Sequence, residues 1–201
     1  MEQIKEYEYV DLGLPSGLKW AKCNVGATHE TDYGYYFQWG DIEDKSNANC
    51  DWSSYKHGDG SNFSKYNPVL NGYIGTIDGK VILDLDDDAA KAYMGSDWRM
   101  PTKNEIQELI DNTDSEWATI NGINGRKFTS RIDTSKYIFI PASGYRLGSS
   151  FRGQGRGGDI WSSSLNTVLP GGALELGFSS GTIYMGDSAR YYGLVVRGVM
   201  D

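Results

Sequence analysis

The residues best suited to chemistry in this sequence are two cysteines and two histidines. Cys23 and Cys50 could form a disulfide or stay as buried thiols, and the sequence leaves both possibilities open. His29 and His57 stand in loop-like segments, and the chain has no Gly-x-Ser-x-Gly pattern that would mark a serine nucleophile. Two cysteines and two histidines are too few for a Cys/His zinc site. We therefore expect no catalytic residue and no enzymatic activity.

Two further patterns resemble ligand sites but lack essential parts. Asp86, Asp87 and Asp88 could bind calcium, yet the Asp/Asn alternation and the glycine of an EF-hand loop are missing. The same aspartates suit the first turn of a helix, where they favour the helix dipole. Residues 153–158 are rich in glycine, but no Gly-Lys-Ser/Thr ending follows, as a phosphate-binding loop requires. We expect no metal site and no cofactor.

Composition excludes several classes of partner. The chain has 201 residues, 27 acidic and 19 basic, for a net charge of −8, which disfavours a nucleic-acid partner. No apolar run approaches the roughly 18 residues of a membrane span, so we expect no membrane insertion. No basic stretch leads into an apolar segment at the start, so we expect no signal peptide in this chain.

The elements that must position any site are short strands, loops and two helices. The apolar spacing predicts a helix over residues 84–94, and a Thr102-x-x-Glu105 capping box after Pro101 predicts the start of a second. Residues 41–79 are polar and read as long surface loops. The patterns predict one α+β domain over residues 1–201, with strands at residues 9–12, 19–22, 35–39, 137–141 and 194–199.

The last third of the chain has an unusual composition. Residues 142–199 hold 13 glycines and no lysine, and Glu175, Gln154, Met185 and Trp161 are each the single residue of their type there. One interpretation is a glycine-rich β region with long loops. The other is a surface whose side chains vary freely on a few fixed anchors. These anchors would be Trp161, Pro170, Phe178, Ile183, Met185 and Val196.

Six ordered motifs carry a resemblance to a known family. They are residues 9–14 (YVDLGL) with 19–27 (KWAKCNVGA), 33–40 (YGYYFQWG), 98–105 (WRMPTKNE), 141–146 (PASGYR), 161–164 (WSSS) and 190–197 (RYYGLVVR). In this order they resemble the Fibrobacter succinogenes major paralogous domain of gut Bacteroidetes and their phages. The resemblance implies a C-type-lectin-like fold of the formylglycine-generating-enzyme subtype, with two helices packed on short antiparallel sheets.

Residues 142–199 also resemble the variable region of proteins diversified by retroelements. There a reverse transcriptase rewrites adenines, and randomised AAC codons cannot give Lys, Glu, Gln, Met or Trp. The resemblance implies a ligand-binding face made of Leu147, Phe151, Arg152, Asp159, Ile160, Val168, Leu169, Gly171, Gly172, Gly181, Thr182, Tyr184, Gly186, Asp187, Ser188, Ala189 and Tyr192.

Strand alternation supports part of this assignment. Thr182, Tyr184 and Gly186 should point one way, and Ile183 and Met185 the other. We expect a core position for the alternating Leu174, Leu176 and Phe178, so they are left out of the binding face.

We expect Trp161 and Arg197 to support the fold and not to bind ligand, with Arg197 hydrogen-bonded to backbone carbonyls or to a carboxylate. Because aromatic and arginine side chains usually dominate binding energy, we expect hot spots at Phe151, Arg152, Tyr184 and Tyr192.

These observations favour a non-enzymatic protein that binds a protein or glycan on a target cell. The chain lacks the Glu-Pro-Asn, Gln-Pro-Asp and Trp-Asn-Asp triplets of calcium-dependent lectins, and it has no cysteine after Cys50, where the formylglycine-generating enzymes keep a pair. An undiversified carbohydrate-binding adhesion module is the main alternative, and a degenerate enzyme of that subtype is the third. The resemblance implies a location on a virion or bacterial surface, and a homo-oligomer is possible.

Overall fold

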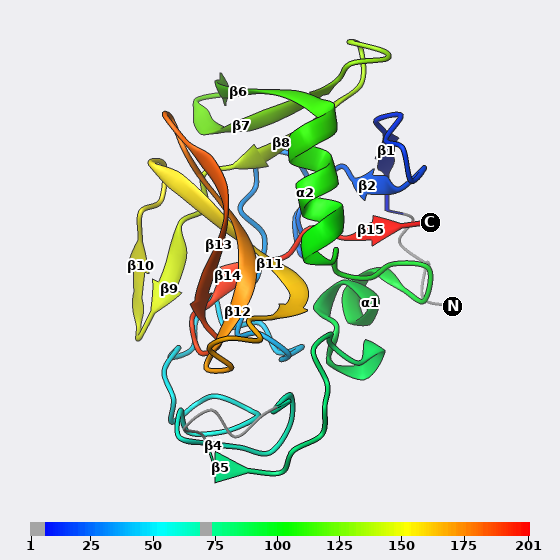
Figure 1. The fold of residues 1–201 in the computed structure, drawn as a ribbon. Helices are drawn as coiled ribbons and strands as arrows, with labels where there is room; N and C mark the ends of the chain where they lie inside the picture. Colours follow the sequence, from blue (N-terminus) through cyan, green and yellow to red (C-terminus); the bar gives the residue numbers. More distant parts are fainter. Residues whose placement is uncertain (1–6, 69–73) are drawn as a thin grey trace, which may run out of the picture.

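The structure is a computed structural model that describes residues 7–68 and 74–201. Residues 1–6 of the expected domain and residues 69–73 of the expected loop segment lie outside the described residues. Within the described ranges the chain has a mixed α+β fold, in which short helices accompany five small sheets (Figure 1). The expected α+β class is therefore confirmed.

A five-stranded sheet lies at the centre of the fold (Figure 1). In spatial order its strands are β13 (Ile183–Ala189), β12 (Gly172–Ser179), β11 (Gly157–Leu165), β14 (Leu194–Val195) and β3 (Tyr36–Phe37). The three long strands pair antiparallel, and the short β14 runs parallel to β11. This order places β13 at one edge of the sheet.

The two faces of this sheet pack into different cores. Ile160, Leu176 and Val195 belong to one cluster of buried apolar side chains, which also contains Trp20 and Phe128. Their strand neighbours face the opposite way, because successive side chains of a strand alternate between faces. Trp161, Ala173 and Leu194 thus belong to the second cluster, together with Phe37, Trp39 and Trp98.

Helix α2 (Lys103–Asn112) begins where the capping box predicts. The Thr102 side chain accepts a hydrogen bond from the Glu105 backbone N–H, and the Glu105 carboxylate accepts one from the Thr102 N–H. Ile106 and Leu109 are buried in the first core, and Ile110 packs against it. The predicted start and apolar stripe of this helix are confirmed.

The helix predicted over residues 84–94 is wrong as a single element. The structure has a 3₁₀ turn, η1 (Leu85–Asp87), followed by a separate helix, α1 (Ala89–Met94). Asp88 stands between them in an extended conformation, and its carboxylate accepts hydrogen bonds from the Lys91 and Met100 backbone N–H groups. Asp88 is thus an N-cap that starts a new helix.

A three-stranded antiparallel sheet follows α2 directly. Its strands are β6 (Thr113–Ile120), β7 (Ile123–Ser130) and β8 (Tyr137–Pro141). The sequence analysis predicts β8 but not the β6–β7 hairpin. Asn121 and Gly122 join the hairpin with φ angles of 49° and 81°, the two positive values that a tight hairpin turn requires.

The two ends of the described chain meet in a small sheet of β1 (Tyr9–Asp11), β2 (Lys19–Ala21) and β15 (Val199–Met200). The single strand predicted over residues 194–199 is instead two strands, β14 and β15, separated at Arg197. This fully buried side chain donates to the carbonyl oxygens of Ala21, Lys22 and Phe139. The expected framework role of Arg197 is confirmed.

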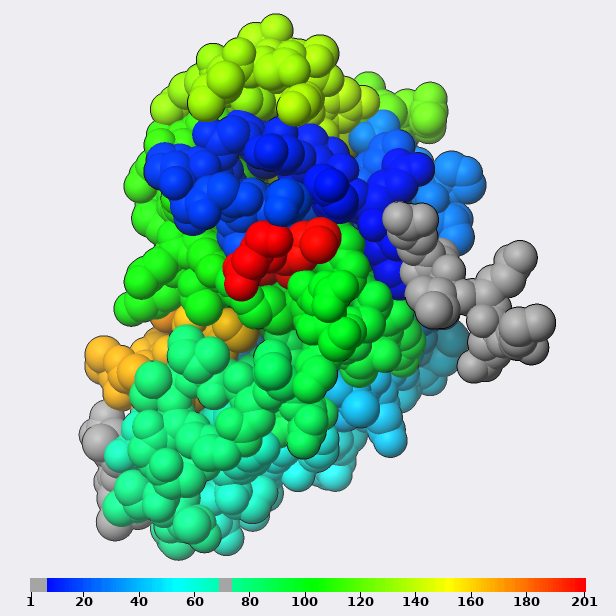
Figure 2. Space-filling model, turned by 90° about the vertical axis from the view of Figure 1, so that its right-hand side faces the viewer, coloured from blue at the N-terminus to red at the C-terminus, as the bar shows by residue number. Residues whose placement is uncertain are grey.

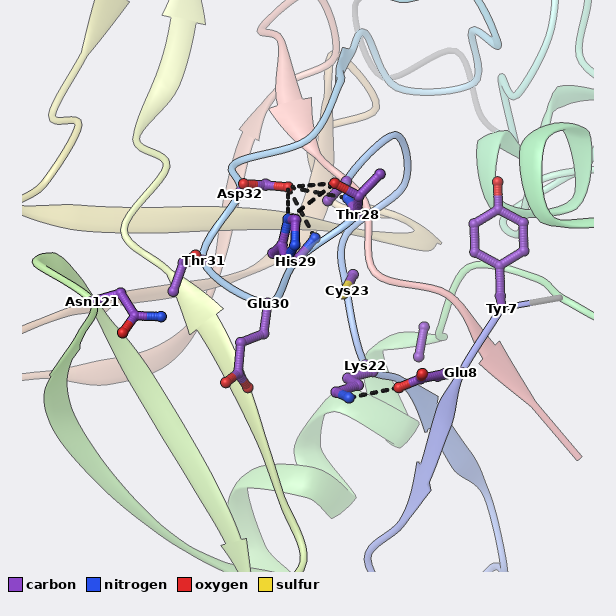
Figure 3. Close-up of a pocket in the computed structure, with 12 residues that line it drawn as sticks. Tyr7, Glu8, Lys22, Cys23, Thr28, His29, Glu30, Thr31, Asp32 and Asn121 are labelled. Carbon is purple, nitrogen blue, oxygen red and sulfur yellow. Dashed lines mark hydrogen bonds and ion pairs between the residues drawn. The ribbon is translucent and has the colours of Figure 1, made fainter. Parts of the chain in front are cut away.

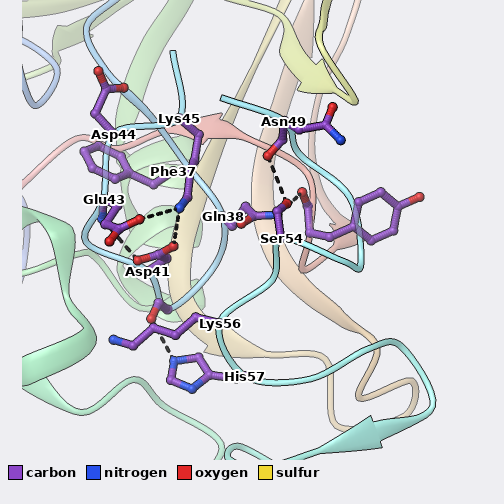
Figure 4. A network of polar contacts seen from close by, with 12 residues as sticks. Phe37, Gln38, Asp41, Glu43, Asp44, Lys45, Asn49, Ser54, Lys56 and His57 are labelled. Carbon is purple, nitrogen blue, oxygen red and sulfur yellow. Dashed lines mark hydrogen bonds and ion pairs between the residues drawn. The ribbon is translucent and has the colours of Figure 1, made fainter. Parts of the chain in front are cut away.

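The long polar segment after β3 has little regular structure, and polar and ionic contacts help to hold it in place. Its only strands among the described residues are the two-residue β4 (Asn62–Phe63) and β5 (Ile74–Gly75). Lys45 Nζ lies 2.9 Å from Asp41 and 2.8 Å from Glu43 (Figure 4). The His57 ring contacts the Gly40 carbonyl oxygen at 2.8 Å in the same view. These contacts explain how a glycine-rich and aspartate-rich segment keeps a defined shape.

Asp87 connects this segment to η1. Its carboxylate accepts hydrogen bonds from Lys56 at 2.7 Å and from Lys65 and the Tyr66 hydroxyl at 2.6 Å each. Burial alone would raise the pKa of the Asp87 carboxyl, but these donors outweigh it and hold that pKa well below its ordinary value.

A depressed carboxyl pKa stabilises the fold above the unfolded pKa near 4 and loses that contribution as the pH falls. We expect Asp87→Asn to lower the free energy of unfolding at pH 7 by about 1–3 kcal/mol, since it removes hydrogen bonds between charged groups that reach solvent. The variant should also lose less stability than the wild type between pH 5 and pH 3. Urea unfolding at pH 7, 5 and 3 measures both effects. Asp86→Asn, at a side chain 97% exposed, is the matched control and should change neither value.

Candidate binding surface

Strand β13 carries the largest group of expected binding residues. Tyr184 is 50% exposed, whereas Ile183 and Met185 pack against the first core. The predicted alternation along this strand is confirmed. The expected residues on β13 and on the turn before it are Gly181, Thr182, Tyr184, Gly186, Asp187, Ser188 and Ala189, and each is at least partly exposed.

A loop between β11 and β12 extends this surface at the end of β13. Val168 and Leu169 are 70% and 55% exposed, and the Asn166 side chain accepts hydrogen bonds from both of their backbone N–H groups. The Gly171 carbonyl accepts from the Arg190 N–H, which follows directly after β13. Gly172 is buried and pairs with Ala189. The loop thus continues the surface, although Gly172 itself contributes only backbone.

A second hairpin, β9 (Tyr145–Leu147) and β10 (Ser150–Arg152), holds the other expected residues. Phe151 is 42% exposed, and its ring lies 4.4 Å from the Arg146 guanidinium and 5.1 Å from the Tyr36 ring. Arg152 is exposed and Leu147 half-buried. Arg146 is buried and donates to the carbonyls of Ser46 and Ala48, so it anchors this hairpin to the polar segment.

Ile160 corrects the expected set of binding residues. It is 1% exposed, pairs with Leu176 and belongs to the first core. Its neighbour Asp159 points to the opposite face, because adjacent residues of β11 cannot face the same way. Assigning both residues to one surface was therefore wrong for Ile160 and leaves Asp159 in place.

Two tyrosine rings connect β9 to the turn after β13. Tyr192, an expected binding residue, stacks on Tyr145 with 5.3 Å between ring centroids and 3° between ring planes. Tyr191 packs edge-on against Tyr192 at 4.9 Å, and Trp52 of the polar segment packs on Tyr191 at 4.7 Å. This row of rings brings the hairpin and the β13 region together.

Glu175 is the residue of this surface that the sequence analysis missed. It lies on β12 opposite Gly186 of β13, and only 4% of it is exposed. Burial, followed by repulsion from Asp159, raises the pKa of the Glu175 carboxyl to about 8. The available signal was a single glutamate between Leu174 and Leu176, on the strand face that the apolar pattern does not use.

A hollow with a volume of about 580 Å³ lies elsewhere on the described surface. Figure 3 shows Asp32 bonded to Thr28 and His29 at one edge, the Lys22–Glu8 ion pair at the other and Cys23 between them. None of the expected binding residues lines it. Burial raises the pKa of the Cys23 thiol, which disfavours the nucleophilic thiolate. Cys23 and Cys50 are both free thiols.

Most of the expected binding residues lie away from the side of the molecule that carries the chain ends, and the loop between β11 and β12 is the exception. Figure 2 shows that side, where the first strands, α1 and β15 are visible and residues after 142 other than β15 appear mainly as an orange strip at the left edge. Figure 1 places β9, β10 and β13 together on the opposite side. Tyr184, Gly186 and Ser188 of β13 lie on the same face of the sheet as Asp159, whereas Asp187 and Ala189 alternate to the other face at its edge. We call these residues, with Glu175 and the other expected residues except the buried Ile160 and Gly172, the β13 surface.

No protein-family model, curated protein or solved structure matches the chain. No three His, Cys, Asp or Glu side chains of residues 7–68 and 74–201 are placed to hold a metal ion. None of the helices in these ranges is long and apolar enough to cross a membrane. Any functional interpretation therefore depends on the chain's own residues.

Proposed function

We propose that this chain is a non-enzymatic receptor-binding protein that uses the β13 surface to hold a protein or glycan of a target cell. The observation that carries the proposal is the alternation of side chains along β13. Tyr184 is exposed, whereas Ile183 and Met185 pack against the core. Outward residues of such a strand can change without removing core contacts. Rigid aromatic rings beside small polar residues also suit adaptable recognition.

We further propose that the scaffold is a C-type-lectin-like fold of the formylglycine-generating-enzyme subtype, diversified by a retroelement and displayed on a virion or bacterial surface. The ordered motifs and the lysine-free last third support this assignment. Sequencing the gene's neighbourhood tests the diversification. A reverse-transcriptase gene with a repeat that differs at adenines is the expected result. Absence of both, together with binding on a glycan array, would favour an undiversified carbohydrate-binding module.

Cell binding tests the function itself. We expect the fluorescently labelled chain to bind at least one strain of a panel of gut bacteria in flow cytometry. Tyr184→Ala, Tyr192→Ala, Phe151→Ala and Arg152→Ala should reduce affinity, and a hot spot among them should cost about 1–3 kcal/mol, or about 5- to 150-fold.

The matched control for cell binding is Tyr9→Ala, which removes a tyrosine 51% exposed on β1, far from the β13 surface. This variant should bind as the wild type does. Unchanged binding by all four surface variants, or equal loss with Tyr9→Ala, would contradict the proposal. Repeating the glycan array with a chelator tests for calcium-dependent binding.

A further inference from the structure

The β13 surface contains a buried carboxylate with an unused hydrogen-bonding atom. Glu175 is 4% exposed, and within the described residues its Oε2 atom has no hydrogen-bond partner. A buried polar atom without a partner costs free energy comparable to a lost hydrogen bond, and more when the group is charged. Such an atom in a candidate binding surface indicates that a donor arrives with the ligand.

A second carboxylate lies on the same face of the sheet. Asp159 of β11 pairs with Gly177, which is two residues from Glu175 along β12. This diagonal relation places the two residues about 7–8 Å apart on one face. Exposed Asp187 of β13 also acts on Glu175 through its charge. The local charge is therefore acidic on all three adjacent strands.

No basic side chain of the described residues pairs with Glu175 or Asp159, and none contributes to the altered acidity of either carboxyl. Arg190, the arginine nearest to Glu175 in sequence, is fully buried and donates instead to the carbonyls of Lys65 and Tyr66. Arg156, three residues before Asp159, is exposed and has no part in the altered acidity of either carboxyl. The charge of the carboxylate pair is thus left uncompensated by the protein itself.

Aromatic rings border the carboxylates. A Cβ atom placed on Gly186 would lie 2.8 Å from Tyr184 Cε2 and 3.3 Å from Glu175 Oε1, so both groups surround the same point above β13. The Tyr184 ring also covers Gly177, the partner of Asp159. Tyr192 is close enough to Glu175 to be influenced by its charge. A cation beside Glu175 would therefore also meet tyrosine rings, whose faces attract positive charge.

Building on the binding function proposed above, we propose that the β13 surface takes up an arginine guanidinium of a protein ligand on the Glu175 and Asp159 carboxylates, with the exposed Tyr184 ring turning aside to admit it. A guanidinium suits the site better than an ammonium because it is planar, weakly hydrated and carries five donors. It can donate to a carboxylate while it stacks on a tyrosine ring.

Binding of a cation here should release protons. Burial raises the pKa of Asp159 to about 6, and burial with repulsion from Asp159 raises that of Glu175 to about 8. At pH 6 Glu175 is mostly protonated and gains nothing from a cation, whereas at pH 8 much of it is charged. The other groups that act on Glu175 are Ser188 and Asp187, and the charge of the pair acts in turn on Tyr184 and Tyr192. None of these groups is a cation. Affinity for guanidinium should therefore rise from pH 6 to pH 8.

The test uses N-acetyl-arginine amide as the probe and the neutral, nearly isosteric N-acetyl-citrulline amide as its control. NMR follows the backbone amide signals of Gly177 and Gly186 in the ¹⁵N-labelled chain during titration with each probe. At pH 8 the arginine probe should shift these signals saturably, with an affinity at least tenfold above that of citrulline. Its affinity should fall about tenfold at pH 6. This comparison uses the wild type alone and does not depend on whether a variant folds.

Substitutions at the two carboxylates show which of them accepts the hydrogen bonds of the guanidinium. Glu175→Gln should weaken the arginine probe at least tenfold and remove most of the pH dependence, leaving only the smaller part that comes from Asp159. Asp159→Asn should weaken the probe about threefold or more. Glu116→Gln, at a side chain 67% exposed on β6, removes the same charge elsewhere and should leave binding unchanged.

The inference would be overturned if the arginine and citrulline probes shifted the amide signals equally, or if neither shifted them. It would also be overturned if glucosamine, an amino sugar titrated in the same way, bound more tightly than the arginine probe. The cell-binding assay separates the two proposals. If the surface variants abolish cell binding while the arginine probe fails, the binding function stands and the guanidinium site does not. If the probe binds as expected but no cell or glycan does, the site stands without the proposed function.

Discussion

Replacing Arg197 with methionine is expected to lower the free energy of unfolding by about 3–5 kcal/mol, because several buried acceptors lose their donor at once. The guanidinium donates to Asn24 Oδ1 at 2.8 Å and to the carbonyl oxygens of Ala21, Lys22 and Phe139 at 2.9, 2.6 and 2.8 Å. These acceptors lie on β2, the loop after it and β8, so one side chain joins three segments. Urea unfolding followed by circular dichroism measures the loss.

Arg197→Lys should recover only a small part of this stability, because a single ammonium cannot reach acceptors that a planar fork spans. Arg152→Met is the matched control, since Arg152 is exposed on β10, and it should stay within about 0.5 kcal/mol of the wild type. An Arg197→Met chain as stable as the Arg152→Met chain would show that the buried network contributes little.

Trp161→Ala is expected to destabilise the fold by about 3–5 kcal/mol, the usual range for removing a buried tryptophan. Trp161 is fully buried on β11, and its indole N–H donates to the Phe37 carbonyl oxygen at 2.7 Å. Its removal leaves a cavity in the second core and an acceptor on β3 without a donor. Thermal unfolding monitored by calorimetry gives the change in stability.

Tyr184→Ala provides the contrast, because its ring is 50% exposed and lies over glycines. It should cost less than about 1 kcal/mol. A similar loss in both variants would mean that the β13 surface is part of the structural framework, and the proposal that its residues are interchangeable would fail.

Local signals in the sequence account for the elements that were predicted well. The Thr102–Glu105 capping box marks the start of α2, and the apolar run at Tyr137–Pro141 matches β8 residue for residue. The β6–β7 hairpin was missed because its strands are polar and only partly buried. Its signal was the Asn121-Gly122 pair, whose two positive φ angles suit a tight turn.

The sequence predicts which residues of the β13 surface face outward only where the pattern within a single strand decides it. Alternation along β13 predicts that Tyr184 faces outward and that Ile183 and Met185 face inward. The place of Glu175 depends on how β12 is aligned with both of its neighbours, and this register arises from contacts between residues far apart in the sequence. The pairing of β11 with β12 likewise determines that Asp159 faces the surface and that Ile160 is buried.

The position of β13 at the edge of the sheet limits which amino acids can occupy its exposed positions. Within the described sheet this strand pairs with β12 alone, so its outer backbone N–H and C=O groups can template another chain. Exposed Asp187 places a charge on that edge, where charged residues discourage such pairing. A version of this strand made uniformly apolar would gain contact area and lose solubility. Resistance to aggregation, as well as affinity, therefore restricts the sequences that this edge can carry.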